Sequence, residues 1–271
     1  MATSNIAAFQ ELIINFYDEQ GRHNLAWRQP DAYGFDPYKI MVSELMLQQT
    51  QVARVIPKYD SFLASFPTVA SLAAAPLGAV LTAWSGLGYN RRAKFLQQAA
   101  QLIMVNFEGR LPETSAELRQ LPGVGVNTAG ALLAYAFNQP VVFIETNIRS
   151  VFIHHFFTDN VTVSDRQVLA LVQATLPATS PRQWYWALMD YGSHLKQTTG
   201  NAARRSVSYS KQSTFAGSIR QLRGQVITRL TERPHSAGEL ATMIADDRLP
   251  AVLQALHSEK MITRRGNQLS I

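Results

Sequence analysis

The chain has 271 residues, which is long enough for one large domain or two that bury a sizeable core. It contains no cysteine, which excludes disulfides, thiolate nucleophiles and cysteine-bound zinc or iron–sulfur clusters within these residues. The net charge of +6 is concentrated in Tyr191–Thr231, which holds seven basic residues and no acidic one. Such a segment favours an anionic partner, and a solvated basic surface is the alternative.

Apolar residues recur at helical spacing through most of the first 196 residues, which predicts an all-α body. The expected helices are Ile6–Tyr17, Ile40–Tyr59, Val80–Phe95, Leu96–Phe107, Asn127–Phe137, Thr146–Phe157, Ser164–Leu176 and Pro181–Leu195. Thr114 and Glu117 have the spacing of a capping box. Breaks are expected at Pro57, Pro67, Pro76 and Gly86–Gly88.

The composition changes after residue 196. Residues 197–218 are rich in Ser, Thr, Gln and Arg, which predicts a basic loop or linker, with a disordered tether as the alternative. Residues 219–271 predict a small module with a β-hairpin around Gly266–Asn267. Its expected helices are Gly224–Leu230, Ala241–Ala245 after a capping box at Ser236–Glu239, and Leu249–Leu256. Three helices and a hairpin resemble a winged helix, a module that binds DNA or proteins.

The segment Met1–Gln10 lacks the basic start and apolar run of a signal peptide. No stretch approaches the about 18 consecutive apolar residues that a membrane span requires. We therefore expect a cytoplasmic protein without membrane contact.

A glycine-containing turn, Leu121-Pro-Gly-Val-Gly125, precedes the helix that begins near Val126. Glycines allow a tight turn and a close approach to a partner, and the free N–H groups of the helix start suit a DNA phosphate. An ordinary helix–helix turn would have the same pattern. The candidate DNA contacts in this turn are Pro122, Gly123, Val124 and Gly125, and a monovalent cation could also bind here.

Three further segments accompany this turn: Ser43–Val52 (SELMLQQTQV), Trp84–Ala93 (WSGLGYNRRA) and Phe143–Val151 (FIETNIRSV). In this order and spacing, the four segments resemble the helix-hairpin-helix DNA glycosylases. The similarity is greatest to the MutY family, which removes adenine opposite 8-oxoguanine. It covers about Phe9 to Leu195. It implies a two-lobed fold with a barrel lobe of about residues 30–136 and a second lobe of residues 1–29 and 137–196.

Cleavage of an N-glycosidic bond requires a proton for the leaving base and negative charge beside the sugar cation, after the nucleotide has been flipped out. Glu44 lies in the apolar run Ile40–Leu47, where the pKa of a carboxyl is raised. The resemblance implies that Glu44 protonates adenine. The alternative is a surface glutamate on an amphipathic helix.

The resemblance implies that Glu145 steadies the sugar cation and helps to position water. The family has Asp at this position, so the longer side chain leaves a purely helix-dipole role open. Asn147 matches a residue that orients the carboxylate or the water. Asn127 replaces the Lys of the bifunctional members, and an amide cannot form a Schiff base, which implies a monofunctional enzyme. Asn127 could equally be a simple helix N-cap.

Arg28 matches the entrance of the base pocket, where it could hydrogen-bond the flipped base. About three inserted residues near Ala32–Phe35 change the sequence of this entrance. Other matched residues would fill the hole left by flipping and contact the opposite strand, and stacking on Tyr89 would contribute about 1–3 kcal/mol per base. These residues are Gln48, Gln49, Leu87, Gly88 and Tyr89. Tyr89 could otherwise be an ordinary half-buried residue.

Most members of the family carry four cysteines after the helix that matches Pro181–Leu195, and these hold a [4Fe–4S] cluster. This chain resembles the clusterless minority, so we expect no cofactor. We expect Arg204, Arg205 and Lys211 to contact DNA phosphates instead.

The C-terminal domain that recognises 8-oxoguanine in the family does not match residues 219–271, which leaves the opposite base open. Adenine opposite 8-oxoguanine or guanine is the first choice. A glycosylase for thymine, uracil or another modified base, and a catalytically inactive DNA-binding protein, are the alternatives. We expect a monomer associated with the nucleoid, with the tail module available to a protein partner.

Overall fold

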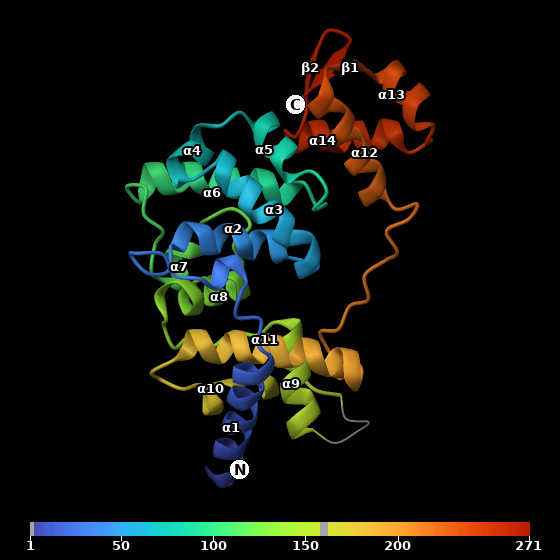
Figure 1. The fold of residues 1–271 in the computed structure, drawn as a ribbon. Coiled ribbons are helices and arrows are strands. Elements are labelled where there is room, and N and C mark those ends of the chain that lie inside the picture. Colours follow the sequence, from blue (N-terminus) through green and yellow to red (C-terminus); the bar gives the residue numbers. More distant parts are fainter. Residues whose placement is uncertain (1–2, 158–161) are drawn as a thin grey trace. The chain divides into compact units, whose positions relative to one another are not determined.

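The computed structural model of the chain describes residues 3–157 and 162–271 (Figure 1). Met1 and Ala2, which belong to the segment expected to lack a signal peptide, lie outside the described residues. Nearly all regular structure is helical, and one small antiparallel sheet lies near the C-terminus, which confirms the predicted fold class. No helix among the described residues is both long enough and apolar enough to cross a membrane.

The described residues group into two compact units. The first comprises the described residues up to Ile40, with Glu113–Gln120 and Val124–Lys211. Its elements are α1 (Thr3–Gln20), the 3-10 helix η1 (Ala26–Arg28), α7 (Ser115–Leu118), α8 (Val126–Phe137), α9 (Thr146–Phe156), α10 (Asp165–Thr175), α11 (Pro181–Thr198) and the 3-10 helix η2 (Ala202–Arg205).

The long helix α11 is the centre of the first unit, because α1, α8 and α9 all pack against it. The aromatic ring of Phe9 from α1 lies 5.4 Å from that of Phe152 and 5.9 Å from that of Trp184. At Gly192 a β-carbon would come within 2.4 Å of the carbonyl oxygen of Asn147, so α9 and α11 approach each other as closely as backbones can. This contact fixes the start of α9.

The second unit comprises Met41–Pro112, Leu121–Gly123 and Gln212–Ile271. Its elements are α3 (Val52–Ser65), α4 (Val69–Ala74), α5 (Leu77–Trp84), α6 (Arg91–Asn106), α12 (Ile219–Glu232), β1 (His235–Ser236), α13 (Ala237–Ile244), α14 (Leu249–Ser258), β2 (Thr263–Arg265) and β3 (Gln268–Ser270). The chain passes from the first unit to the second within α2 (Pro37–Leu47). Helix α6 packs against α4 and α5, and α12 packs against α5 and α14.

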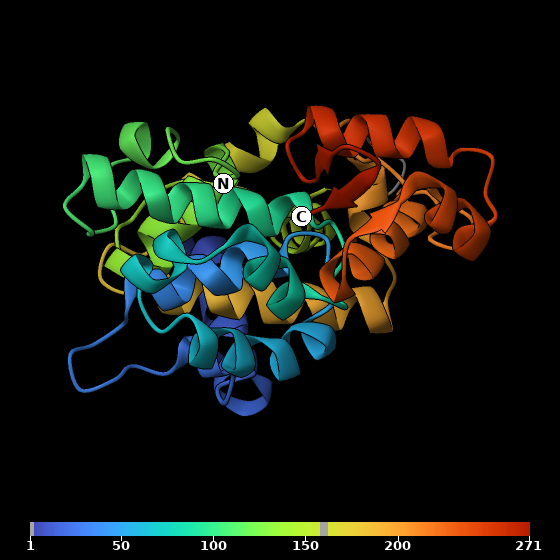
Figure 2. The same cartoon turned by 90° about the horizontal axis from the view of Figure 1, so that it is seen from above.

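The C-terminal module has the predicted helices and hairpin (Figures 1 and 2). Ser236 and Glu239 form the expected capping box at the start of α13. Strands β2 and β3 pair antiparallel around Gly266, with Arg264 opposite Leu269. A third strand, β1, was not expected from the sequence, and it pairs with β3 to give the order β1-β3-β2.

The structure corrects three local predictions. Pro57 lies inside α3 and does not break it, since one face of that helix buries Val55, Tyr59 and Phe62 and the packing outweighs the lost hydrogen bond. The single helix expected over Ile40–Tyr59 is divided between α2 and α3 at residues 48–51. The predicted linker 197–218 is partly ordered, because η2 packs on α9 and Ser206 pairs with Val163.

The two compact units divide the chain at different points from the predicted lobes. Helix α8 groups with the first unit, and residues 219–271 group with residues 41–112. The lobe and linker boundaries expected from the sequence therefore remain a prediction.

Candidate active site

Glu44 lies on α2, one turn before the end of the helix. The helix has no broad polar face, because its side chains are buried on nearly all sides of Glu44, and Glu44 itself is half-buried. The buried residues are Ile40, Met41, Val42, Ser43, Leu45 and Met46. This environment does not fit a solvated surface glutamate on an amphipathic helix. The role of Glu44 as the acid remains a prediction.

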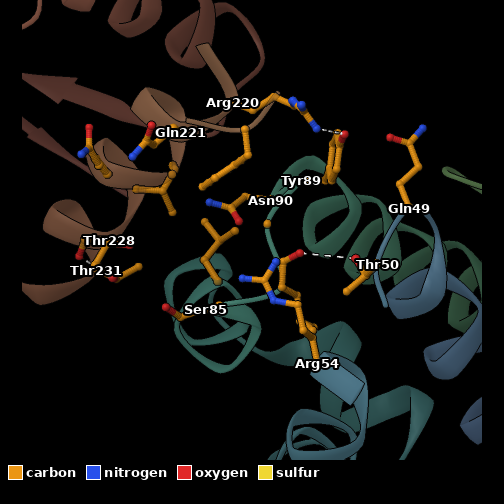
Figure 3. A pocket seen from close by; sticks show the side chains of 18 of the residues that line it. Gln49, Thr50, Arg54, Ser85, Tyr89, Asn90, Arg220, Gln221, Thr228 and Thr231 are labelled. Carbon is orange, nitrogen blue, oxygen red and sulfur yellow. Dashed lines mark hydrogen bonds between the residues drawn. The ribbon is translucent and has the colours of Figure 1, made fainter. Parts of the chain in front are cut away.

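Two loops of the second unit carry the residues expected to replace the flipped nucleotide: Gln48–Thr50 and Leu87–Tyr89. Gln49 has a φ of 54° and Tyr89 a φ of 48°, so both side chains are held by backbone in the left-handed region. This conformation costs a non-glycine residue about 1 kcal/mol or more, and such strain is concentrated at functional sites. The side chains of Gln49 and Tyr89 line a pocket of the second unit (Figure 3), and the expected contact of these residues with the opposite strand remains a prediction.

A residue that the sequence reasoning missed, Arg92, joins the two loops. Its guanidinium donates to the carbonyl oxygens of Gln48 (2.5 Å), Leu87 (3.2 Å) and Gly88 (3.0 Å), and also to the hydroxyl of Thr50. Arg92 is buried, and burial lowers its pKa to about 10, which still leaves it protonated at neutral pH. The sequence signal that could have indicated Arg92 is the second of the two consecutive arginines in the segment Trp84–Ala93.

Leu87 differs from the expectation for a residue that contacts DNA. Its side chain is only 3% exposed and packs in the core, while its carbonyl serves Arg92. The exposed side chain of this cluster is Gln49, with Tyr89 and Gln48 half-buried. The buried side chain of Leu87 therefore packs the loop against the core and is not available to a ligand.

The glycine-containing turn has the conformation that its sequence predicts. Gly123 has a φ of +82°, and a β-carbon there would lie 3.0 Å from Cβ of Phe95. Gln48 donates from its side-chain amide to the carbonyl of Gly123 at 3.2 Å, which links the end of α2 to the turn. Gly125 is the exposed N-cap of α8 and has no side chain to occupy the free N–H groups of the helix start.

Asn127 is exposed in the first turn of α8. Since Gly125 is the N-cap residue, the interpretation of Asn127 as a simple N-cap is wrong. Pro122 is half-buried and Val124 is buried, so Val124 can meet a ligand only through its backbone.

Glu145 is the N-cap residue of α9, but its side chain makes no capping hydrogen bond. The side chain is half-buried, and burial raises its pKa to about 6. The cause is desolvation, since removal of a carboxyl from water disfavours its charged form. A carboxylate that titrates near pH 6 can stabilise a cation and accept a proton from water at neutral pH.

Asn147 lies two residues after Glu145, in the first turn of α9. Its amide nitrogen donates to the carbonyl of Met189 on α11 at 3.2 Å. This bond fixes the side chain of Asn147 against α11, and the close approach at Gly192 fixes its backbone. The structure therefore brings Glu145 and Asn147 to one rigid helix start.

The resemblance implied that Arg28 could hydrogen-bond the flipped base, but its guanidinium is already paired in the structure. Its two terminal nitrogens donate to the two carboxylate oxygens of Asp190, at 2.8 and 2.9 Å, and the residue is 7% exposed. Burial opposes ionisation of Asp190, but Arg28 and Arg22 outweigh it and lower the pKa of that carboxyl. The pair joins η1 to α11, and Arg28 faces a pocket of about 450 Å³ in the first unit.

The three basic residues expected at DNA phosphates have different surroundings. Arg205 donates to the carbonyls of Ile153 (2.9 Å) and Phe157 (3.4 Å), and so it supplies hydrogen bonds to carbonyl groups at the C-terminal end of α9. Arg204 and Lys211 are exposed. Arg205 is therefore a structural residue, while the other two are available to an anion.

The candidate residues are distributed over both compact units. Glu44 belongs to the second unit with Gln48, Gln49 and Tyr89, whereas Glu145 belongs to the first unit with Asn147, Arg28 and Asn127. The pairing of the two glutamates in one site therefore remains a prediction. In the described part of the chain, no group of three or more His, Asp or Glu side chains is arranged to hold a metal ion.

Comparison with known proteins relates these features to a family. The profile of the HhH-GPD superfamily of base excision DNA repair proteins matches residues 42–177. An adenine DNA glycosylase of Buchnera aphidicola is 36% identical over 188 residues, which are 68% of this chain and 52% of that protein. An adenine DNA glycosylase of Mycobacterium tuberculosis is 32% identical over 272 residues, covering 91% of this chain and 88% of the relative.

Among solved structures, a thermostable thymine-DNA glycosylase matches with a TM-score of 0.61 at 23% identity. The match covers 70% of this chain and 87% of that one, and at this identity it concerns the fold alone. The chain spans about half the length of the Buchnera relatives that it matches.

Proposed function

The chain belongs to the HhH-GPD superfamily of base excision DNA repair proteins, and we propose that it removes adenine from duplex DNA. The adenine that it removes is mispaired with 8-oxoguanine or guanine. The reaction is hydrolysis of the N-glycosidic bond of a flipped nucleotide and leaves an abasic site. The observation that carries the proposal is Glu145, a half-buried carboxylate that no capping bond occupies, with its pKa raised to about 6.

Each carboxyl has its own task. Glu44, enclosed by the apolar residues of α2, protonates the leaving adenine, which departs poorly as an anion. Glu145 in its ionised form stabilises the positive sugar and takes a proton from the attacking water. Asn147, held by the carbonyl of Met189, is a positioning residue for that carboxylate. The flip itself costs a few kcal/mol, which contacts to the rest of the duplex must offset.

This chain has no cysteine, so its residues do not fit a [4Fe–4S] cluster, which is held by cysteine thiolates. We propose that direct bonds order the segment that follows α11. Asn201 accepts a hydrogen bond from Ser150 at 3.1 Å, and Ala203 is buried against α9. Arg204 and Lys211 are left exposed to contact phosphates. The protein would act as a monomer without a cofactor.

Two assays on one duplex test this proposal. A duplex with adenine opposite 8-oxoguanine, treated with the protein and then with alkali, should break at the adenine, and it should stay intact without alkali. Borohydride should trap no covalent complex, because Asn127 has no amine to form a Schiff base. Strand breakage without alkali would overturn the monofunctional assignment, and intact DNA after alkali would overturn the substrate.

A further inference from the structure

Asp165, the first residue of α10, accepts hydrogen bonds from two separate parts of the first unit. From α9, the guanidinium of Arg149 donates to both of its carboxylate oxygens, at 2.8 and 3.0 Å. From the segment after η2, the hydroxyls of Ser208 and Ser206 donate at 2.9 and 3.4 Å. These bonds, first of all the one from Arg149, lower the pKa of Asp165, so this carboxyl is ionised at neutral pH.

The two serines reach Asp165 because their segment pairs with the residues just before α10. The N–H of Val163 donates to the carbonyl of Arg205 at 2.9 Å, and the N–H of Val207 donates to the carbonyl of Val163 at 3.0 Å. The hydroxyl of Ser206 also accepts a bond from the N–H of Ser208 at 3.2 Å. The carboxylate of Asp165 is therefore held from both sides and has a fixed orientation.

Arg149 lies one helical turn after Glu145 on α9. The N–H of Arg149 donates to the carbonyl of Glu145 at 2.8 Å, and side chains four residues apart are neighbours on a helix surface. A cation within about 4–6 Å lowers the pKa of a carboxyl by about 1–3 units. The pKa of Glu145 is instead raised, with burial as the cause. The guanidinium of Arg149 is thus directed to Asp165, and its side chain is only 13% exposed.

The other charged and titratable groups on the elements that pack against α9 are engaged or exposed. These elements are α10, α11 and η2. On α11, Asp190 is paired with Arg28 and Arg22. Of the remaining groups, Arg182, Tyr185 and Arg205 donate to backbone carbonyls, Tyr191 and His194 stack on each other, and Arg166, Lys196 and Arg204 are exposed. Arg149 is therefore the cation whose release would affect Glu145 first.

We propose that Asp165 is a positioning residue for the reaction: it holds the guanidinium of Arg149 at α10, so that Arg149 does not pair with the carboxylate of Glu145. The inference rests on the proposed function, because that function gives Glu145 its task beside the sugar cation. A carboxylate already paired with an arginine would stabilise that cation less, since its charge would be partly neutralised. The same carboxylate of Asp165 also holds the segment that follows η2.

A ¹³C NMR titration of the full chain without DNA tests the proposal. The carboxyl signal of Glu145 is identified by its loss in Glu145→Gln, and in the wild type it should titrate near pH 6. Asp165→Asn frees Arg149 and should lower this midpoint by about one pH unit or more. Asp165→Glu keeps the negative charge and should restore the midpoint. Asp246→Asn is the matched control, since it removes the partner of Arg248 in the C-terminal module and should change nothing.

Two further variants separate movement of Arg149 from the simple loss of a charge. Arg149→Met removes the other member of the pair and should raise the midpoint by only a few tenths of a unit, roughly the effect of a charge at a distance. The double variant with Asp165→Asn should titrate like the wild type. Asp165→Ser replaces the asparagine variant if that one does not fold. Equal and opposite shifts in the two single variants, or no shift in either, would overturn the proposal.

Excision gives an independent readout. At pH 7.5, Asp165→Asn should remove adenine about tenfold more slowly, the equivalent of one pKa unit, and Asp165→Glu should recover the rate. The titration requires neither DNA nor excision, so a protein that shows the predicted shifts but removes no adenine would contradict the proposed function alone. Normal excision by Asp165→Asn with equal and opposite shifts would contradict this inference alone.

Discussion

The guanidinium of Arg92 lies beneath the ring of Tyr89, with its central carbon 5.5 Å from the ring centre. The same group donates to carbonyls of Gln48 and Gly88, so one buried cation holds both loops that carry the strained residues Gln49 and Tyr89. Those loops come from segments about forty residues apart. Arg92 therefore sets the position of the side chains that we assign to the opposite strand.

Replacing Arg92 by Met should lower the free energy of unfolding by about 3 kcal/mol, because several buried carbonyls would lose their donor. Urea denaturation measures this change. Arg91→Met is the control, since that neighbour makes a partly exposed ion pair and should cost less than about 1 kcal/mol. Arg92→Lys should recover only part of the loss, because an ammonium cannot reach both loops. Equal effects of the Arg91 and Arg92 variants would contradict the role of Arg92.

The hydrogen bonds of Arg92 are an example of contacts that could not be predicted from the sequence. Local signals predicted most of the fold: the capping box at Ser236 and the turn at Gly266 match the structure, and the helical periodicity before α11 gave the helical class but not every helix boundary. Contacts between distant segments were not visible. Arg28 pairs with Asp190, 162 residues away, and nothing near Arg28 in the sequence indicates that partner.

In the candidate site, too, local motifs were visible in the sequence and long-range contacts were not. Glu44, Glu145 and Asn147 were found through motif resemblance, and the structure adds the bond from Asn147 to Met189 and the burial of Glu145. Leu87 and Arg205 were expected at DNA, yet their side chains serve the core and the end of α9. Residue type and charge alone could not separate these roles, because packing decides which side chains remain available.

Glu44→Gln should reduce single-turnover excision by a factor of about 10² to 10⁴, the usual contribution of a general acid. Duplex affinity should change little, since the substitution keeps the size of the side chain. Rapid-quench kinetics and equilibrium binding measure the two effects separately. An excision rate within a few-fold of the wild type would show that another group protonates the base.

From the raised pKa of Glu145 we predict that the excision rate rises with pH, whereas the free energy of unfolding falls with pH. The excision rate should rise with pH through about 6, as the carboxylate forms. The folded pKa lies above the ordinary value, so the folded state holds more protons than the unfolded state between about pH 4.5 and 6. The stabilising effect of the neutral form is complete below that window and is lost as the pH rises through about 6.

Glu145→Gln should therefore raise the free energy of unfolding at pH 7.5 by up to about 2 kcal/mol and leave it nearly unchanged at pH 4. Thermal denaturation at the two pH values measures the difference. The same variant should lose excision. A destabilised variant at pH 7.5 would contradict the assigned burial of the carboxylate.

Gln49→Gly should relieve the left-handed backbone and stabilise the free protein by up to about 1 kcal/mol, while duplex binding weakens because the side chain is gone. Gln51→Gly provides the comparison, since Gln51 has an ordinary φ of −69° and should only lose stability. Denaturation and duplex titration of both variants suffice. A destabilising effect at Gln49 would mean that the strain is not relieved by glycine.

Arg204→Ala and Lys211→Ala should each flatten the salt dependence of duplex binding by about one unit of slope if the residue contacts a phosphate. Arg205→Ala should instead lower the melting temperature, because the end of α9 would lose its donor. Binding titrations across a salt series distinguish these outcomes. A steep, unchanged slope in the Arg204 and Lys211 variants would leave that segment without a DNA contact.

Single-turnover excision on a panel of duplexes tests whether this protein removes adenine. The panel contains adenine opposite 8-oxoguanine, adenine opposite guanine, thymine and uracil opposite guanine, and an alkylated base, each treated with alkali after reaction. We predict cleavage at adenine opposite 8-oxoguanine, and to a lesser degree opposite guanine, with Glu145 in the place of Asp. Cleavage only at thymine, uracil or the alkylated base, or tight binding without cleavage of any duplex, would contradict it.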